Sequence, residues 1–151
     1  ETPAGSLYLL EPVAQTTRET LAALSSHLPP QGTLVGFPEG GFFNYVLGRR
    51  NPLPEEQFFP GHLDARGEQA TIDRLIERPP DAVVICNVLA VGHGSLAFGK
   101  DYLVQLGRFL EERFVPGASF GPGAGANARI GDEQFFVTIR IPRPRAASPI
   151  P

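Results

Sequence analysis

The sequence contains no methionine and no tryptophan, and its 151 residues include one cysteine and one lysine. Because Cys86 is the single cysteine, an intrachain disulfide is excluded. It lies in the apolar run of residues 82–86, where we expect a buried and inert thiol. The chain opens at Glu1 rather than at a methionine, so we expect it to be part of a larger protein. Twelve arginines accompany Lys100, an imbalance that we attribute to genome composition more than to function.

Long apolar runs are also missing. No segment reaches the roughly 18–20 consecutive apolar residues that a membrane-spanning helix needs, and no basic region precedes an apolar core as in a signal peptide. We therefore expect the sequence as given to be soluble. Its net charge is −3 and it has no basic patch with interleaved aromatic residues, which argues against a nucleic-acid partner. A chain of this length with 42% hydrophobic and 19% charged residues is typical of one globular domain.

Apolar residues recur at helical spacing in several segments, most clearly at Leu103, Leu106, Leu110 and Phe114. We expect helices over residues 17–28, 42–47, 68–77 and 100–114. Short apolar runs bounded by proline and glycine predict strands over residues 7–10, 33–37, 82–86 and 118–120. Residues 135–141 alternate along the chain between two faces, which predicts a half-exposed antiparallel strand at or near a sheet edge.

Helices that alternate with apolar strands predict an α/β fold. We expect a three-layer domain with a mainly parallel central sheet and a C-terminal antiparallel edge strand or hairpin. Residues 1–141 would form this single domain. Residues 142–151 contain several prolines and are expected to be an extended or disordered tail.

Ligands of open α/β sheets sit beyond the carboxyl ends of the strands, so the connections after residues 37 and 86 are the places to search. Backbone N–H groups at Gly40 and Gly41 could receive an anion, with a guanidinium from the following loop as a bidentate partner. The candidate ligand-binding residues are Glu39, Gly40, Gly41, Asn44, Arg49, Arg50, Asn51, Asn87 and His93. A plainer interpretation is that the glycines only permit a tight turn, and that the arginines are solvated or pair with Glu39 or Glu55.

The sequence matches none of the common nucleotide-binding, metal-binding or catalytic motifs. The PEGG sequence fits neither GxGxxG nor GxxxxGK[ST], so no nucleotide cofactor is expected, and no other cofactor is indicated. The histidines His27, His62 and His93 lack metal-ligand spacing, so no metal is expected. Ser95 is not part of a GxSxG nucleophile elbow, and a carboxylate dyad of Glu39 with Asp64 or Glu55 has only weak support. No residue is therefore assigned a catalytic role.

The order of several segments carries more information than any one of them. The chain contains FPEGGFFNYVLGRRNPL, a loop that ends in FFPGHLD, a helix leading to ERPPDAVVICN, and then FGKDY at the start of a helix that runs to EERF. This succession, over about residues 17–121, resembles the soluble C-terminal domain of bacterial multi-pass membrane glycosyltransferases. Those enzymes are related to the dolichyl-phosphate-mannose protein mannosyltransferases and use polyprenyl-phosphate sugars.

The resemblance implies an α/β domain on the extracytoplasmic (periplasmic) face of the bacterial inner membrane. Its partners would be the transmembrane portion of the parent chain and a glycan, lipid or protein acceptor. The family's catalytic acidic residues lie between early transmembrane helices, outside this sequence. The expected function is thus a non-catalytic accessory domain that helps to bind the acceptor or covers the membrane-embedded active site. The positions that match the pattern, without a settled role, are Pro38, Glu39, Gly40, Asn44, Gly48, Arg49, Asn51, Pro52, Pro80, Asp81, Asn87, Gly99 and Tyr102.

Two alternatives from other classes stay open. The chain could be a free-standing soluble α/β enzyme or sugar-binding protein with its cleft at the carboxyl ends of the strands. It could also be a purely structural interaction domain, in which Glu39, Arg49 and Arg50 only hold the loop.

Overall fold

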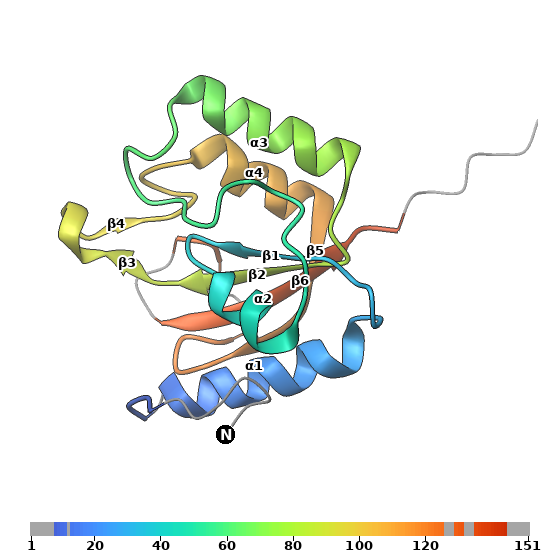
Figure 1. The fold of residues 1–151 in the computed structure, drawn as a ribbon. Coiled ribbons are helices and arrows are strands. Elements are labelled where there is room, and N and C mark those ends of the chain that lie inside the picture. Colours follow the sequence, from blue (N-terminus) through green and yellow to red (C-terminus); the bar gives the residue numbers. More distant parts are fainter. Residues whose placement is uncertain (1–7, 12, 126–128, 132–134, 145–151) are drawn as a thin grey trace, which may run out of the picture.

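The computed structural model describes residues 8–11, 13–125, 129–131 and 135–144, which form one mixed α/β domain (Figure 1). The helices are α1 (Val13–His27), α2 (Gly41–Leu47), α3 (Ala65–Glu77) and α4 (Val104–Arg113). The strands are β1 (Leu34–Phe37), β2 (Ala82–Asn87), β3 (Leu89–Ala90), β4 (Leu96–Ala97), β5 (Phe114–Phe120) and β6 (Phe136–Pro142). None of the helices in the described ranges has the length and apolar character needed to cross a bilayer.

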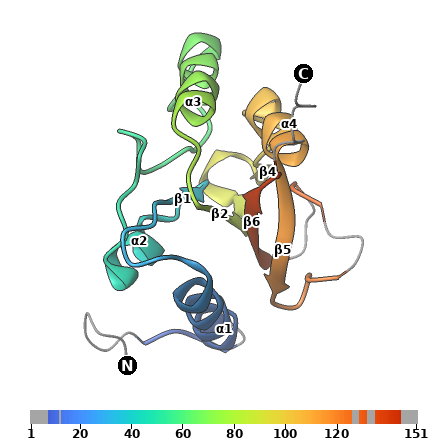
Figure 2. The same ribbon diagram turned by 90° about the vertical axis from the view of Figure 1, so that its right-hand side faces the viewer.

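The central sheet has four strands in the order β1-β2-β6-β5, as the view across the sheet in Figure 2 shows. Strands β1 and β2 are parallel, whereas β6 is antiparallel to both of its neighbours. The expected C-terminal hairpin is therefore present as β5 and β6. The expectation of a mainly parallel sheet is not confirmed, because the hairpin places its second strand next to β2 and makes the sheet mixed.

Strand β6 lies inside the sheet, not at the edge where its alternating sequence had placed it. Its residues 136–140 are all buried. The polar side chains that suggested exposure are paired inside the protein: the hydroxyl of Thr138 lies 2.9 Å from that of Ser119, and Nη1 of Arg140 donates to the carbonyl oxygen of Phe114. Burial also lowers the pKa of the Arg140 guanidinium, an effect that nearby Glu111 opposes and Arg143 strengthens.

Helices cover both faces of the sheet, so the three-layer arrangement is present (Figures 1 and 2). Side chains alternate along β1 and β2: Val35 and Phe37 pack in a core with residues of α3 and α4, while Leu34 packs in a second core with residues of α1 and α2. Every residue of β1 is buried. This two-sided burial explains why β1 and β2 appear in the sequence as uninterrupted apolar runs.

Helix boundaries depend on caps. Helix α3 begins after Asp64, whose side chain accepts a hydrogen bond from the N–H of Gly67 (2.8 Å). Helix α4 begins at Val104 rather than at residue 100, and its third N–H, that of Leu106, donates to the buried carboxylate of Glu68 on α3 (2.8 Å). The cap of α4 is thus supplied by a residue distant in the sequence.

The remaining differences are local. Helix α1 begins at Val13, four residues before the expected start, and residues 8–10 of the expected first strand are not in a strand; residue 7 lies outside the described residues. Residues 89–97 form the small β3–β4 hairpin with a 3₁₀ turn at Val91–His93, which sequence periodicity did not indicate. Of the expected tail, Pro142 ends β6, and residues 145–151 lie outside the described part.

Candidate functional site

A pocket of about 600 Å³ opens at the carboxyl ends of β1 and β2. Its walls come from segments far apart in the sequence: Leu9 before α1, Phe42 on α2, Cys86 at the end of β2, and Phe135 before β6. The other lining residues are Val13, Thr17, Glu39, Gly41, Phe43, Glu56, Gln57, Val88 and Val137. This apolar pocket lies at the connections after both strands, which the sequence analysis named as the places to search for a ligand site.

The rim of the apolar pocket carries two carboxylates, Glu39 and Glu56, both exposed. Backbone contacts fix their positions: Glu39 pairs with Gln57 in an antiparallel bridge, and the N–H of Phe58 donates to the carbonyl oxygen of Pro38 (2.8 Å). The ring of Phe58 is fully buried, with its centroid 4.6 Å from that of Phe37. The rim is therefore anchored to the core, although its charged groups face solvent.

Gly40 has a packing role. A Cβ atom at Gly40 would overlap with the Cα of Gly36, and the reverse holds as well, because the two backbones touch where the chain turns from β1 into α2. Gly41 differs, since an added Cβ there would meet no atom within 4 Å. Close packing in the turn therefore requires glycine at residue 40, whereas residue 41 lies on an open pocket wall where a side chain has room.

Cys86 lines the apolar pocket as a half-buried residue. Burial, and to a lesser extent the nearby Glu39 carboxylate, raise the pKa of its thiol to about 12. The same two causes raise the pKa of the Tyr102 hydroxyl to about 12. Both groups are neutral near pH 7, so Cys86 has no thiolate to act as a nucleophile.

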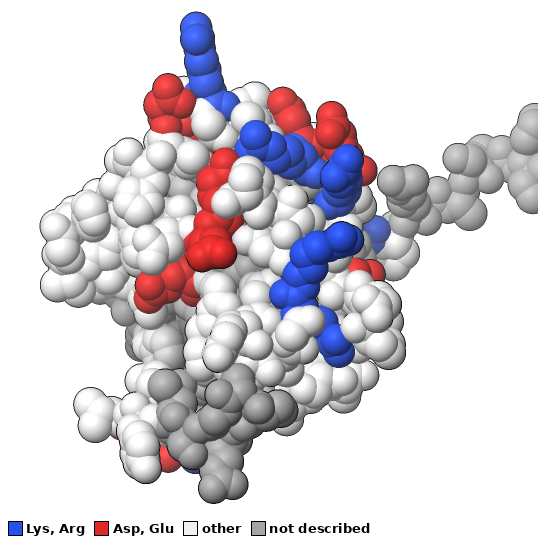
Figure 3. Space-filling view, viewed as in Figure 1, with Lys and Arg blue, Asp and Glu red and all other residues white. Residues whose placement is uncertain are grey.

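A second hollow, of about 610 Å³, adjoins the apolar pocket and shares Gly41 and Glu56 with it. We call it the polar hollow; its further lining residues are Asn44, Tyr45, Gly48, Arg49, Arg50 and Asn51. Four of the predicted ligand-binding side chains, those of Asn44, Arg49, Arg50 and Asn51, therefore line the polar hollow. Glu39 lies instead on the rim of the apolar pocket. Figure 3 shows acidic side chains gathered in the centre of this face of the molecule and basic side chains to their right.

Three side chains of the polar hollow already hold the loop. Nδ2 of Asn44 donates to the carbonyl oxygens of Leu34 (2.8 Å) and Arg49 (3.1 Å). Asn51 binds the backbone within its own turn, with Nδ2 donating to the carbonyl oxygen of Glu55 (2.9 Å). Nη1 of Arg49 donates to the carbonyl oxygen of Pro30 (2.6 Å). Arg50 is exposed, and its side chain makes no hydrogen bond or ion pair within the described ranges.

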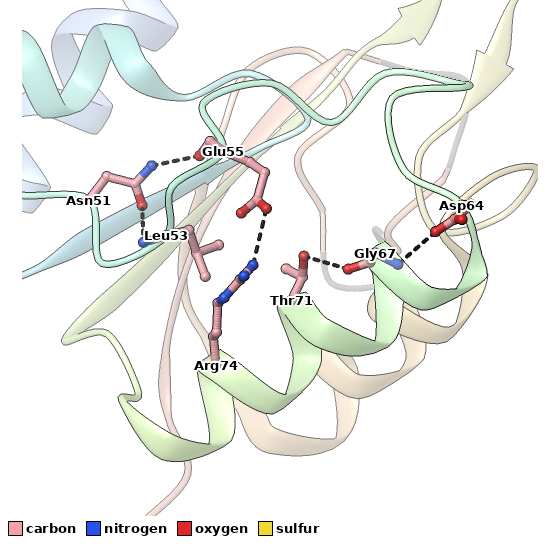
Figure 4. A network of polar contacts seen from close by, with 7 residues as sticks. All are labelled: Asn51, Leu53, Glu55, Asp64, Gly67, Thr71 and Arg74. Atoms are coloured by element: carbon pink, nitrogen blue, oxygen red, sulfur yellow. Dashed lines mark hydrogen bonds and ion pairs between the residues drawn. The ribbon is translucent and has the colours of Figure 1, made fainter.

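The same loop is tied to α3 by the contacts drawn in Figure 4. The Asn51 side chain accepts from the N–H of Leu53 (3.0 Å), and the carboxylate of Glu55 pairs with Arg74 of α3 (3.1 Å). Glu55 was one of the two expected partners of Arg49 or Arg50. In the structure it pairs with Arg74 instead. The Arg50 backbone helps to hold the loop, because its carbonyl oxygen accepts from the N–H of Leu34 (3.1 Å), but the Arg50 side chain is not used for this within the described ranges.

Asn87 and His93 lie outside both hollows. The buried side chain of Asn87 accepts a hydrogen bond from the N–H of Gly131 (3.0 Å), so it fastens a distant segment to the end of β2. His93 is exposed on the 3₁₀ turn, where its ring stacks on Phe59 with a centroid distance of 6.3 Å. Neither residue lines the apolar pocket or the polar hollow.

Sequence reasoning missed Glu56, which borders both hollows, and the apolar side chains of the pocket. The acidic pair at residues 55–56 was a visible signal, but nothing in the sequence told which of the two would face solvent. No group of histidine, cysteine and acidic residues within the described ranges is arranged to hold a metal ion. Comparisons with protein families, with curated proteins and with solved structures found no match to this chain.

Proposed function

We propose that this chain is a non-catalytic accessory domain of a membrane glycosyltransferase that uses polyprenyl-phosphate-linked sugar. In this proposal the domain lies on the extracytoplasmic side of the membrane and the polar hollow helps to bind the acceptor. The order of segments from PEGG to FGKDY supports the family. The observation that carries the proposed role is the gathering of Asn44, Arg49, Arg50 and Asn51 around one open hollow.

The chemistry of the polar hollow suits an acceptor with hydroxyl or phosphate groups. Arg50 offers a guanidinium that the described part of the protein does not use, Tyr45 is 73% exposed, and Glu56 supplies an exposed carboxylate. A guanidinium binds phosphate oxygens in a bidentate manner, and a carboxylate accepts from sugar hydroxyls. The asparagines and Arg49 hold this surface in place and would act indirectly.

A second function is favoured by the position of the apolar pocket. A pocket at the carboxyl ends of β1 and β2 is where a free-standing α/β enzyme or small-molecule binding protein carries its cleft. The two functions are distinguished by the reading frame that contains Glu1. Several upstream segments of about 20 apolar residues would support the membrane enzyme, and a frame without them would refute it.

The role of the polar hollow is tested in the full-length gene product by Arg50→Ala, with Arg66→Ala on α3 as the matched control. Both arginines are exposed, so neither change should affect folding. We expect the Arg50→Ala protein to show a KM for the acceptor raised about tenfold, as for the loss of one charge-assisted hydrogen bond, and an unchanged KM for the donor. Equal acceptor KM values in both variants would contradict the proposed role.

A further inference from the structure

The apolar pocket has a composition that restricts what can occupy it. Its walls are hydrocarbon and aromatic, including Phe42 and Phe135, and its volume of about 600 Å³ lies within the roughly 300–1,000 Å³ typical of small-molecule sites. An apolar ligand or apolar part of a ligand would therefore be removed from water there, which is favourable in proportion to the area buried.

The charged side chains that line the apolar pocket, among the residues that the structure describes, are both acidic. Glu39 and Glu56 are its ionisable rim groups, and no arginine, lysine or histidine is among the described residues that line it. Neither carboxylate side chain makes a hydrogen bond or ion pair with another described residue. Arg49 and Arg50 belong to the adjoining polar hollow. The rim therefore attracts a cation and repels an anion.

The backbone holds the two carboxylates in place without neutralising them. Glu39 is fixed by its bridge to Gln57, and Glu56 precedes that residue directly. Because the backbone under these two side chains is already placed by this bridge, less backbone ordering is needed when a ligand binds.

We propose that the apolar pocket binds a small amphiphilic ligand that has a hydrocarbon body and a cationic, amine-type head. The body would pack against Phe42 and Phe135, and the protonated amine would lie between Glu39 and Glu56. This site adjoins the polar hollow and shares Gly41 and Glu56 with it. It does not rest on the membrane-enzyme proposal, because it follows from the apolar pocket itself.

The test compares three probes with the same octyl chain and different heads: octylammonium, octanoate and octyl glucoside. Binding to the 151-residue chain is measured by calorimetry at neutral pH. Two exposed rim charges of modest strength predict that octylammonium binds about tenfold more tightly than octanoate. The preference should be lost in the double variant Glu39→Gln with Glu56→Gln, and retained in the control with Glu77→Gln and Glu112→Gln, which removes the same charge from exposed positions elsewhere.

The location of the bound probe is tested independently. Gly41→Leu places a side chain at the pocket wall where an added Cβ meets no atom within 4 Å, so the variant should fold and should lose octylammonium binding. A circular dichroism spectrum shows that each variant is folded.

The proposal is overturned if octanoate or octyl glucoside binds as tightly as octylammonium, or if none of the three binds at millimolar concentration. It is also overturned if the preference for the cation survives in the Glu39 and Glu56 double variant. A dimer that Gly41→Leu dissociates would assign the pocket to a second copy of the chain and would equally refute a small cationic ligand.

Discussion

The apolar pocket and the polar hollow lie side by side after β1 and have similar volumes, about 600 and 610 Å³. They differ in how their polar side chains are used. In the polar hollow, Asn44, Arg49 and Asn51 hydrogen-bond the backbone and build the loop. On the rim of the apolar pocket, Glu39 and Glu56 are held by the backbone and leave their carboxylates unpaired among the described residues. Polar residues gathered in one loop can thus be structural, while charges at an apolar opening stay available.

The largest expected effect removes the residue that anchors the rim of the apolar pocket to the core. Phe58 is fully buried against Phe37 and lies next to the rim. Phe58→Ala should lower the free energy of unfolding by about 3–5 kcal/mol, because it leaves a cavity in the core. Urea unfolding measures this change. A loss below about 1 kcal/mol would mean that the loop does not depend on this anchor.

A smaller effect separates structural from available side chains within the polar hollow. Asn44→Ala removes the two hydrogen bonds to Leu34 and Arg49 and should lower the free energy of unfolding by about 2 kcal/mol. Arg50→Ala is the matched control and should change it by at most about 0.5 kcal/mol. If the two variants were equally stable in urea unfolding, the assignment of Asn44 to the loop structure would be wrong.

Some elements of the fold could be predicted from the sequence and others could not. The apolar runs gave β1 and β2 correctly, and glycine after residue 47 marked the end of α2, where Gly48 adopts a left-handed conformation with φ 60°. Strand β6 was misplaced because Arg140 is polar in sequence but buried in the structure. The start of α4 was misplaced because its cap comes from Glu68, 38 residues earlier. Local patterns do not contain such long-range contacts.

The same reason explains the outcome for the candidate site. Loop residues with suggestive chemistry could be found from composition, and four of them do line one hollow. The apolar pocket could not be found, because its lining residues become neighbours only when the helices pack on the sheet. Examples are Leu9, Phe42, Cys86 and Phe135. The sequence also could not show whether the side-chain amide of Asn44 binds a ligand or its own loop, because either role requires the same amide group.

The smallest expected effect concerns the floor of the apolar pocket. The pKa of Cys86 is raised from 9.0 to about 12, so above pH 9 the unfolded chain loses a proton that the folded chain keeps. The free energy of unfolding should therefore fall as pH rises, by about 1 kcal/mol at pH 10. Cys86→Ala should lack this fall between pH 9 and 10. Identical pH profiles for the two proteins would contradict an enclosed thiol.

The difference between the two hollows is tested most directly by following the amide resonances of the ¹⁵N-labelled chain during titration with octylammonium. The largest shifts are expected at Glu39, Cys86 and Val88, which line the apolar pocket and not the polar hollow. Shifts centred instead on Asn44, Arg49 and Arg50 would show that the polar hollow is the binding surface, and would contradict the assignment of the free carboxylates to a cation site.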